Sequence, residues 1–387
     1  MPLDITPLVT PWTEILFDQV PGLELFDAHT HVGQNDPDGM KQTPEELLAG
    51  LQQARARGAF VFPMHEPEGY TKANDMVLAA AAESDGRLVP FCRVNPHDNA
   101  LAEATRALDA GARGIKLHPR AEQFTLDHPA VRALAALAHE RSLPILIHAG
   151  RGIPALGLHA VELAGDFPDA RLILAHAGIS DLSWIWRAAP DLPNLLFDTA
   201  WWMPADMLTL FSLVPPGQIL FASDAPYGRT GLSATFQFRS ALQVGLSAEQ
   251  IRSIASEQSL RIAAGEPLAP AGPAVGEREQ APHLLLDRVG EMLLLGVIST
   301  MRGTPEAGLE MLALARLACD VPDDVDDAPA FAAIRDLIAL FDQLNTEHPE
   351  DRARLGPLIM AATVARTPDV PVPSSGFAPR STEAQPA

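Results

Sequence analysis

Short apolar runs alternate with longer amphipathic stretches from about residue 23 to residue 264. The apolar runs have the length of buried strands, and the stretches between them place Ala and Leu at three- and four-residue spacing, as helices with one buried face do. Repeated alternation of this kind predicts βα units and a parallel sheet. The predicted strands cover residues 23–31, 60–65, 88–94, 112–118, 143–148, 171–176, 194–198 and 218–224.

Amphipathic helices are predicted between these strands, for example over residues 43–57, 100–110, 130–141 and 247–264. Eight strand–helix units in about 240 residues match the size of a (β/α)8 TIM barrel. A doubly wound open sheet is the alternative, but the first predicted strand is not followed by the Gly-x-Gly-x-x-Gly turn of its dinucleotide-binding versions. We therefore expect an α/β fold, a (β/α)8 TIM barrel with a C-terminal helical extension.

The pattern changes after residue 264, where a Pro-, Ala- and Gly-rich stretch leads into a region with helical spacing and no strand alternation. The predicted units are a barrel over 1–270, a linker over 271–282, a helical extension over 283–366 and a disordered tail over 367–387. We expect the extension either to pack on the barrel or to meet a second copy of the chain, so a homo-oligomer is left open.

Composition narrows the range of functions. The 387-residue chain has a formal net charge of −21, so it lacks the basic surface that nucleic-acid binding requires. Its apolar runs are much shorter than the roughly 18 to 20 residues of a membrane span. The N-terminal residues show no secretory signal, and Cys92 and Cys319 form no metal-binding or disulfide pattern. We expect a cytoplasmic protein whose partner is a small-molecule substrate.

Ionisable residues stand at the ends of the predicted strands. His29 and His31 are two residues apart, so their side chains point to the same side of a strand. Later runs end in further polar residues, namely Lys116, His118, His148, His176 and Asp224. One such histidine would most simply be a hydrogen-bonded core residue, but catalytic groups of parallel barrels gather at this end. Burying so many ionisable groups is costly without a shared cation, and imidazole with carboxylate suits Zn²⁺, or alternatively Mn²⁺ or Fe²⁺.

Five segments carry these residues in a fixed order. They are Asp27-Ala-His-Thr-His-Val-Gly33, Gly114-Ile-Lys-Leu-His-Pro119, Ile147-His-Ala-Gly150, Ala175-His-Ala-Gly178 and Ser223-Asp-Ala-Pro-Tyr-Gly228. In order and spacing they resemble the amidohydrolase superfamily, in particular the branch that includes aminocarboxymuconate-semialdehyde decarboxylase and related hydrolases. The resemblance spans about residues 23–264 and does not reach the extension. It implies a metal-dependent enzyme in a (β/α)8 barrel.

The resemblance also implies roles for individual residues. The metal ligands would be His29, His31, His148 and Asp224, with His176 beside the bound water or substrate. In such a site the metal activates a water and polarises a carbonyl, and Asp224 accepts the proton of that water as it attacks. We expect Asp224, His176 and Lys116 to be the catalytic residues.

Lys116 decides between one metal ion and two. It shares a face with His118 by strand alternation, and it is one of only three lysines in the chain. In binuclear relatives a carbamylated lysine on the fourth strand bridges two ions, the second held by histidines that here would be His148 and His176. In the competing interpretation, Lys116 stays an ammonium and pairs with a substrate carboxylate or with Asp224. We expect one ion, Zn²⁺, and a second only if Lys116 is carbamylated.

Other polar residues near the strand ends are candidates for the substrate pocket. We expect Arg151, His118, Trp201 and Tyr227 to bind substrate, and Arg151 suits an anionic group because it follows the His-Ala-Gly segment directly. Further candidates are His65, Arg93, Asn95 and Trp202. For all of these, ordinary loop structure is the competing explanation. The remaining histidines receive no role.

Three functions are compatible with these observations. The leading hypothesis is a metal-dependent hydrolase that cleaves a C–N or C–O bond, of amide, ester or lactone type, in a small carbonyl compound through metal-activated water. The alternative keeps the site but decarboxylates an aromatic or dienyl acid without oxidation, because one barrel hosts many chemistries. A third hypothesis is a non-catalytic barrel that acts through its helical extension. A barrel without catalysis would have no evident reason to gather a full set of ligands.

Overall fold

The computed structural model describes residues 3, 5–150, 152–277, 283–322 and 324–373. Its barrel strands all pair in parallel in chain order. They are β1 (Leu25–Val32), β2 (Ala56–Pro63), β3 (Leu88–Pro90), β4 (Cys92–Arg93), β5 (Ile115–Leu117), β6 (Pro144–Ile147), β7 (Arg171–Leu174), β8 (Leu195–Asp198) and β9 (Ile219–Leu220). Each of the eight predicted strands is therefore present, with β3 and β4 as the two halves of the predicted strand 88–94.

Backbone hydrogen bonds join these strands into one ring. Phe91, between β3 and β4, donates its N–H to Val61 of β2 at 2.8 Å, so the two halves form one strand between β2 and β5. On the other side, Ala28 of β1 donates to Phe221 at 2.8 Å and His31 donates to Ala225 at 2.7 Å, just beyond β9. The (β/α)8 TIM barrel predicted from the alternation is confirmed.

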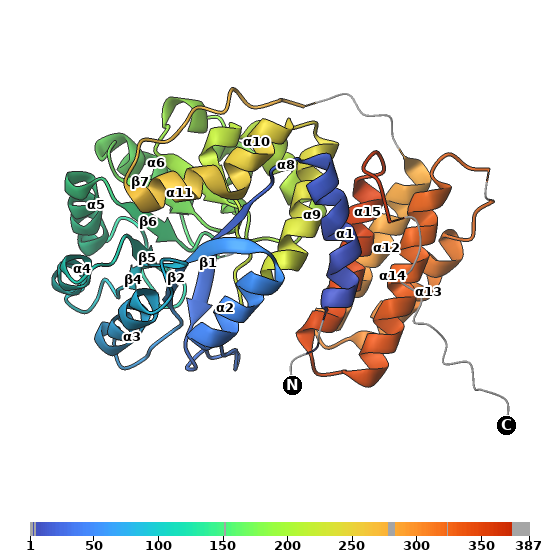
Figure 1. The fold of residues 1–387 in the computed structure, drawn as a ribbon, viewed down its shortest axis with the longest axis horizontal. Helices are drawn as coiled ribbons and strands as arrows, with labels where there is room; N and C mark the ends of the chain where they lie inside the picture. The colour runs from blue at the N-terminus through green and yellow to red at the C-terminus, as the bar shows by residue number, and fades with distance from the viewer. Residues whose placement is uncertain (1–2, 4, 151, 278–282, 323, 374–387) are drawn as a thin grey trace.

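Helices cover the outside of the ring (Figure 1). They are α2 (Pro44–Gln53), α3 (Thr71–Ala82), α4 (Ala100–Asp109), α5 (Pro129–Arg141), α6 (Leu156–Asp166), α7 (Leu182–Ile185), α8 (Pro204–Leu213), α9 (Thr230–Gln243), α10 (Ala248–Arg252) and α11 (Gln258–Ala264). The predicted helix 247–264 is divided, because a π-helical turn over Ser253–Glu257 joins α10 to α11.

The predicted helix 43–57 is too long at its C-terminal end. Thr43 caps α2 in a reciprocal capping box with Glu46, as its sequence predicts, but the helix ends at Gln53 and Arg55 adopts a positive φ of 55°. The chain then enters β2, where a Cβ on Gly58 would lie 2.3 Å from the carbonyl oxygen of Arg87. Close approach of two strands therefore overrides the helical spacing of this segment.

Apolar side chains fill the barrel and the layer around it. Inside the ring lie aromatic and aliphatic residues from successive strands, including Phe26, Phe60, Phe62, Phe91, Leu146, Ile173, Leu196 and Leu220. A larger cluster lies between the strands and the surrounding helices. The barrel interior is thus a packed core below the strand ends, and not a pore.

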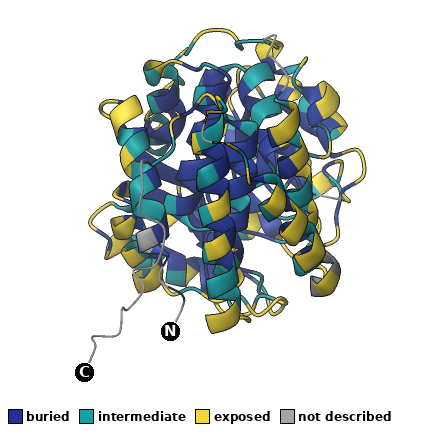
Figure 2. Ribbon diagram, turned by 90° about the vertical axis from the view of Figure 1, so that its right-hand side faces the viewer, coloured by how far each residue is buried: buried dark blue, intermediate teal, exposed yellow. Residues whose placement is uncertain are grey.

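The extension consists of α12 (Leu284–Met301), α13 (Pro305–Ala318), α14 (Ala328–Glu347) and α15 (Gly356–Arg366). It packs on its own barrel through α9 and through α1 (Thr6–Gln19), a helix that the sequence did not predict. Figure 1 shows α1 and α9 between the barrel and the extension, and Figure 2 shows buried residues behind the exposed outer faces. One apolar cluster joins Trp12 of α1 and Phe236 of α9 to Leu293, Leu337 and other extension residues.

The segments around the extension are also held by hydrogen bonds. Before it, Gly276 donates to the carbonyl of Ser212 at 2.8 Å. After it, the buried Arg239 of α9 donates to the carbonyls of Thr367, Val370 and Pro371. Residues 367–373 of the predicted disordered tail are therefore held against the barrel, and the rest of that tail, 374–387, lies outside the described residues. The boundaries between the predicted units stay predictions.

Among the described residues, no helix combines the length and the apolar character needed to cross a membrane.

Candidate functional site

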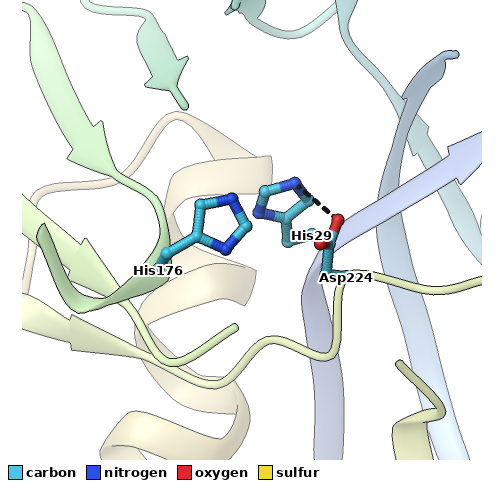
Figure 3. A group of neighbouring side chains, drawn as sticks. All are labelled: His29, His176 and Asp224. Atoms are coloured by element: carbon cyan, nitrogen blue, oxygen red, sulfur yellow. Dashed lines mark ion pairs between the residues drawn. The ribbon is translucent and has the colours of Figure 1, made fainter. Parts of the chain in front are cut away.

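Two histidines and a carboxylate meet at the C-terminal end of the barrel. His29 and His31 lie on β1, and Asp224 follows β9, which neighbours β1 in the closed ring. The Nε2 atoms of the two histidines are 3.1 Å apart, and Asp224 Oδ1 lies 3.2 Å from His29 Nε2 and 3.1 Å from His31 Nε2. Figure 3 shows His29, Asp224 and His176 turned toward a common space. Ring closure thus brings together residues almost 200 positions apart in the chain.

The protonation of His29 follows from its other nitrogen. His29 Nδ1 lies 2.7 Å from Asp198 Oδ2, at the end of β8, so it carries the hydrogen that this carboxylate accepts. Burial lowers the pKa of His29 well below its usual value, which keeps the ring neutral. Its Nε2 therefore presents a lone pair to Asp224 Oδ1 and His31 Nε2. A carboxylate that orients a histidine in this way is the usual support of a metal-binding imidazole.

The spacing of these atoms fits a bound cation. Donor atoms held by a tetrahedral zinc ion at about 2.0–2.1 Å lie about 3.3 Å from one another, close to the 3.1–3.2 Å separations found here. His176 extends the group, because ligand atoms of His29, His176 and Asp224 all lie within 4.8 Å of one another. Neutral imidazoles and a carboxylate are the ligand chemistry of Zn²⁺. The residues present therefore fit a divalent metal ion.

His176 and His148 form a second layer of the same group. His176 Nδ1 lies 2.7 Å from the carbonyl oxygen of Ala200, so it donates there and leaves Nε2 as an acceptor. His148 Nδ1 is 2.9 Å from that Nε2 and donates to it. His148 Nε2 is then a lone-pair atom, buried and without a hydrogen-bond partner among the described residues. His148 Nε2 lies beside Gly150, where a Cβ would be 2.6 Å from it, and the converging ligand atoms are those of His29, His176 and Asp224. The place of His148 as fourth ligand stays a prediction.

The backbone around the ligands is held in position by buried groups. Asp27, two residues before His29, accepts hydrogen bonds from the backbone N–H groups of His29 and Ser223 and from the hydroxyls of Ser223 and Thr230. His176 and Asp224 both adopt positive φ angles, of 57° and 61°. Non-glycine residues in this region are uncommon and concentrate at functional sites.

Lys116 lies beneath these residues on β5, fully buried. Its Nζ is 3.3 Å from His29 Nε2 and 4.7 Å from the centre of the Phe62 ring. Burial lowers the pKa of Lys116 to about 7, although Asp224 and Asp198 oppose the shift. The structure therefore brings Lys116 to the centre of the group. The polar atom in contact with its Nζ is His29 Nε2, and not the carboxylate of Asp224.

Asp224 is the member of the group that faces the barrel mouth, the open space above the C-terminal ends of the strands. Its side chain is 20% exposed, whereas those of His29 and His31 are 1% and 6% exposed. Burial raises the pKa of Asp224 to about 6, with His176 and Lys116 acting in the opposite direction. A cation bound beside Asp224 would favour its carboxylate form, which is the form that a general base needs.

The predicted substrate residues lie around this mouth. The rings of His118 and His148 stack with centroids 3.8 Å apart. Trp201 approaches the ring of His176 at 6.3 Å, and Tyr227 approaches that of His31 at 5.6 Å. Their substrate-binding roles stay predictions. Arg151, the candidate for an anionic group, lies outside the described residues.

The other pocket candidates divide into two places. Trp202 packs toward the apolar cluster of the extension. In contrast, Arg93 is buried and pairs with Glu122, with His65 and Asn95 close by. This second cluster of ionisable groups is separate from the metal ligands.

Sequence reasoning missed two supporting residues, Asp198 and Asp27. Asp198 ends the predicted strand 194–198, so the rule that selected the other strand-end residues would have found it. Asp27 precedes His29 by two positions and shares its strand face, which is a weaker signal. Both act through hydrogen bonds to distant parts of the chain.

Comparison with known proteins agrees with this geometry. The family model described as amidohydrolase matches residues 26–262 of the chain, which is more than half of its length. No curated protein matches it closely in sequence.

Several solved structures share the fold. An uncharacterised TIM-barrel protein from Bordetella bronchiseptica matches with 17% identity and a TM-score of 0.52, over 63% of this chain and 99% of the other. A 2,6-dihydroxybenzoate decarboxylase and a zinc-bound amidohydrolase from Burkholderia multivorans match with 14% and 13% identity and TM-scores of 0.51, each over 62% of this chain and 99% of the other. With the family match and the ligand group at its strand ends, the chain belongs to the amidohydrolase family and is a metal-dependent enzyme of that superfamily.

Proposed function

We propose that this protein is a hydrolase that cleaves a C–N or C–O bond, of amide, ester or lactone type, in a small carbonyl compound. The observation that carries the proposal is the convergence of lone pairs from His29 Nε2, His31 Nε2 and Asp224 Oδ1 at mutual distances of 3.1–3.2 Å. His148 is the proposed fourth ligand. A divalent cation held by these residues would lower the pKa of water to near neutrality and polarise a carbonyl group.

The chain's own residues supply the proton transfers. Asp224 is the partly exposed ligand, so its carboxylate reaches both the cation site and a molecule at the mouth. We assign it as the base that accepts a proton from the attacking water and returns it to the leaving group. His176, fixed by Ala200 and His148, presents no free N–H donor in this tautomer and instead orients His148.

We propose one ion, and we propose Zn²⁺ as its identity. The single ion is based on the convergence of His29, His31 and Asp224; a second ion would need a carbamylated Lys116 together with His148 and His176. The polar atom nearest to Lys116 Nζ is His29 Nε2, a proposed ligand atom of the single ion. Its proposed role is to supply positive charge beside a developing negative charge on the substrate.

Metal analysis together with a divided substrate panel tests the proposal. The purified protein should contain one equivalent of zinc and should hydrolyse at least one member of a panel of amides, esters and lactones. His29→Ala and Asp224→Asn should lose both metal and activity. Release of CO₂ from carboxylated phenols without hydrolysis of the panel would replace the proposal by the decarboxylase alternative. Full turnover by either variant would overturn the assigned site.

A further inference from the structure

Helix α13 of the extension is apolar on two faces. It packs mainly on α12, and Figure 1 shows it on the side of the extension that faces away from the barrel. Its inner face is buried at Leu312 and Ala315. Its outer face carries large apolar side chains as well, because Leu309, Leu314 and Leu317 are 48%, 42% and 72% exposed. Exposed apolar side chains gathered on one face are typical of an interaction surface.

The outer face of α13 has a fixed orientation. The two helices approach closely at a pair of glycines, where a Cβ on Gly308 would lie 3.1 Å from the carbonyl oxygen of Gly296. A Cβ on Gly296 would lie 2.7 Å from the side chain of Leu312. Arg316 forms an ion pair with Asp342 of α14. Turning α13 to bury its outer leucines would break these contacts, so the face can be covered only from outside.

The sequence of this face is symmetric about its middle residue. From residue 309 to residue 317 it reads Leu-Glu-Met-Leu-Ala-Leu-Ala-Arg-Leu. Leu309 and Leu317 lie four positions on either side of the exposed Ala313, and residues four apart lie on the same side of a helix. Glu310 and Arg316 lie three positions on either side of it and carry opposite charges.

A second copy of the helix complements this pattern. In an antiparallel pair related by a two-fold axis near Ala313, each residue meets the one at the same distance on the other side of the axis. Leu309 would meet Leu317 of the second copy, and Glu310 would meet Arg316 of the second copy. Each contact occurs twice. Arg316 has five N–H donors, so it can pair with Asp342 and with the second copy together.

Negative charge opposes this pairing but does not prevent it. The chain has a formal net charge of −21, and Glu306 and Asp320 lie seven positions on either side of Ala313. Seven positions span about 10 Å of helix. Helices that pack through rows of residues four apart cross at about 50°, so at that distance their axes have separated sideways by about 9 Å. The Debye length is about 8 Å at physiological ionic strength, so these two acidic residues are largely screened from each other.

We propose that the outer face of α13 binds a second copy of this chain through a two-fold axis near Ala313. The contact consists of the row Leu309, Ala313 and Leu317 with the pair Glu310 and Arg316 beside it. A single helix pair buries less than the roughly 1,200–2,000 Å² of a typical stable complex. The dimer is therefore weak, with a dissociation constant on the order of 10 μM. This inference does not depend on the proposed hydrolysis.

Sedimentation velocity of the full-length protein tests the dimer. Between about 1 μM and about 200 μM, on either side of the expected dissociation constant, the mass should rise from 41.4 kDa toward twice that value. A mass of 41.4 kDa at every concentration would overturn the proposal.

A pair of matched substitutions locates the contact. Leu309→Glu would place a carboxylate from each copy in the apolar row, so the dissociation constant should rise at least about tenfold. Leu158→Glu is the control, because Leu158 of α6 is 50% exposed and Leu309 is 48% exposed, and it should leave the dissociation constant unchanged. A dimer that forms equally well in Leu309→Glu would overturn the assignment to α13.

A charge exchange tests the two-fold pairing itself. Glu310→Arg alone places two pairs of arginines face to face, and Arg316→Glu alone places two pairs of glutamates, so each variant should be monomeric. An equimolar mixture restores an opposite-charge pair at both contacts and should form dimers about as well as the wild type. Two folded variants that stay monomeric when mixed would overturn the two-fold pairing. If Arg316→Glu does not fold beside Asp342, Leu309→Glu and its control still decide the site.

Discussion

The barrel mouth and the helical extension bury opposite kinds of side chain. At the mouth, charged or ionisable side chains are buried in number, among them Asp27, His29, Arg93, Lys116, Glu122 and Asp198. In residues 283–322 and 324–373, the buried polar side chains are Thr363 and Thr367, and the rest of the buried surface is apolar. Burying charge is expensive unless it is paired or holds an ion. The buried charges at the mouth therefore indicate a functional site, and the apolar core of the extension indicates a contribution to stability.

The two polar clusters of the mouth refine this comparison. Around His29, lone pairs converge and a positive charge from outside the chain completes the group. Around Glu122, the chain supplies its own positive charge in Arg93, 2.6 Å away. One cluster therefore needs a cation that the chain does not supply, and the other is compensated within the chain.

The largest expected effect is loss of activity at the metal ligands. His29→Ala should reduce kcat/KM by about 10³-fold or more, because it removes a ligand of the activating cation. Bound zinc, measured by elemental analysis, should fall in parallel. The thermal midpoint of the metal-free variant should also fall, because the buried Asp198 loses its partner on His29 Nδ1, so activity and zinc are measured at a temperature where the variant is folded. His139→Ala, on the outer helix α5, is the control and should change neither quantity. Equal effects of the two substitutions would contradict the site.

A substitution in the extension core should lower stability and leave activity unchanged. Leu337 of α14 is fully buried, so Leu337→Ala should lower the free energy of unfolding by about 2–5 kcal/mol. Zinc content and kcat should remain unchanged at temperatures where the protein is folded. Leu317→Ala, at a position 72% exposed, should change stability by no more than about 0.5 kcal/mol. Loss of kcat in folded Leu337→Ala would break the division between the two regions.

Asp198→Asn tests the support of the ligand group. The amide cannot accept from His29 Nδ1–H as strongly as the carboxylate does, so zinc affinity should fall by about 10- to 100-fold. Competition with a chelator of known affinity measures this change. Asp166→Asn, on the surface of α6, serves as the matched control. Unchanged affinity in Asp198→Asn would mean that the hydrogen bond at 2.7 Å does not orient the metal ligand.

The smallest expected effect is a loss of stability at high pH, and it should be similar in both regions because each contains one buried cysteine. Burial raises the pKa of Cys92 in the barrel from 9.0 to about 12, and that of Cys319 in the extension from 9.0 to about 11. The unfolded thiols lose their protons above pH 9 while the folded thiols keep theirs, so stability is full below pH 9 and falls as the pH rises. At pH 10 each thiol should account for about 1.4 kcal/mol of lost stability.

Denaturant unfolding at pH 8 and pH 10 measures this loss. Cys92→Ala and Cys319→Ala should each remove about one thiol's share of the difference between the two pH values. Since the comparison is made within each variant, the cost of the truncated side chain cancels. A variant that keeps the wild-type difference would show that its thiol is accessible to solvent in the folded protein.

Some elements could be predicted because their signals are local. The eight strands follow from apolar runs, and the start of α2 follows from Thr43 and Glu46. The end of α2 could not be predicted, because Gly58 meets the carbonyl of Arg87, which lies just before β3 and 29 residues later in the chain. Helix α1 was missed for a similar reason, since its buried Trp12 packs on α9 and the extension, which the sequence places far away.

The same division holds for the candidate site. His29, His31, His148, His176 and Asp224 were selected because they end apolar runs. The sequence did not show which ring nitrogen of each histidine faces the site. For His29 this depends on the hydrogen bond to Asp198, and for His148 it depends on His176, which is itself held by Ala200. The pairing of Arg93 with Glu122 likewise joins a strand end to a turn that carries no periodic signal.

By itself, the sequence determined the periodic elements, the barrel class and the residue types at the strand ends, because these depend on neighbours a few positions apart. Only the tertiary structure decided that β1 lies beside the chain after β9, that lone pairs from His29, His31 and Asp224 meet there, and that Arg93 pairs with Glu122. These features depend on closing the ring and packing the turns above it. Distances between atoms from distant segments are set by that closure, and no local pattern encodes them.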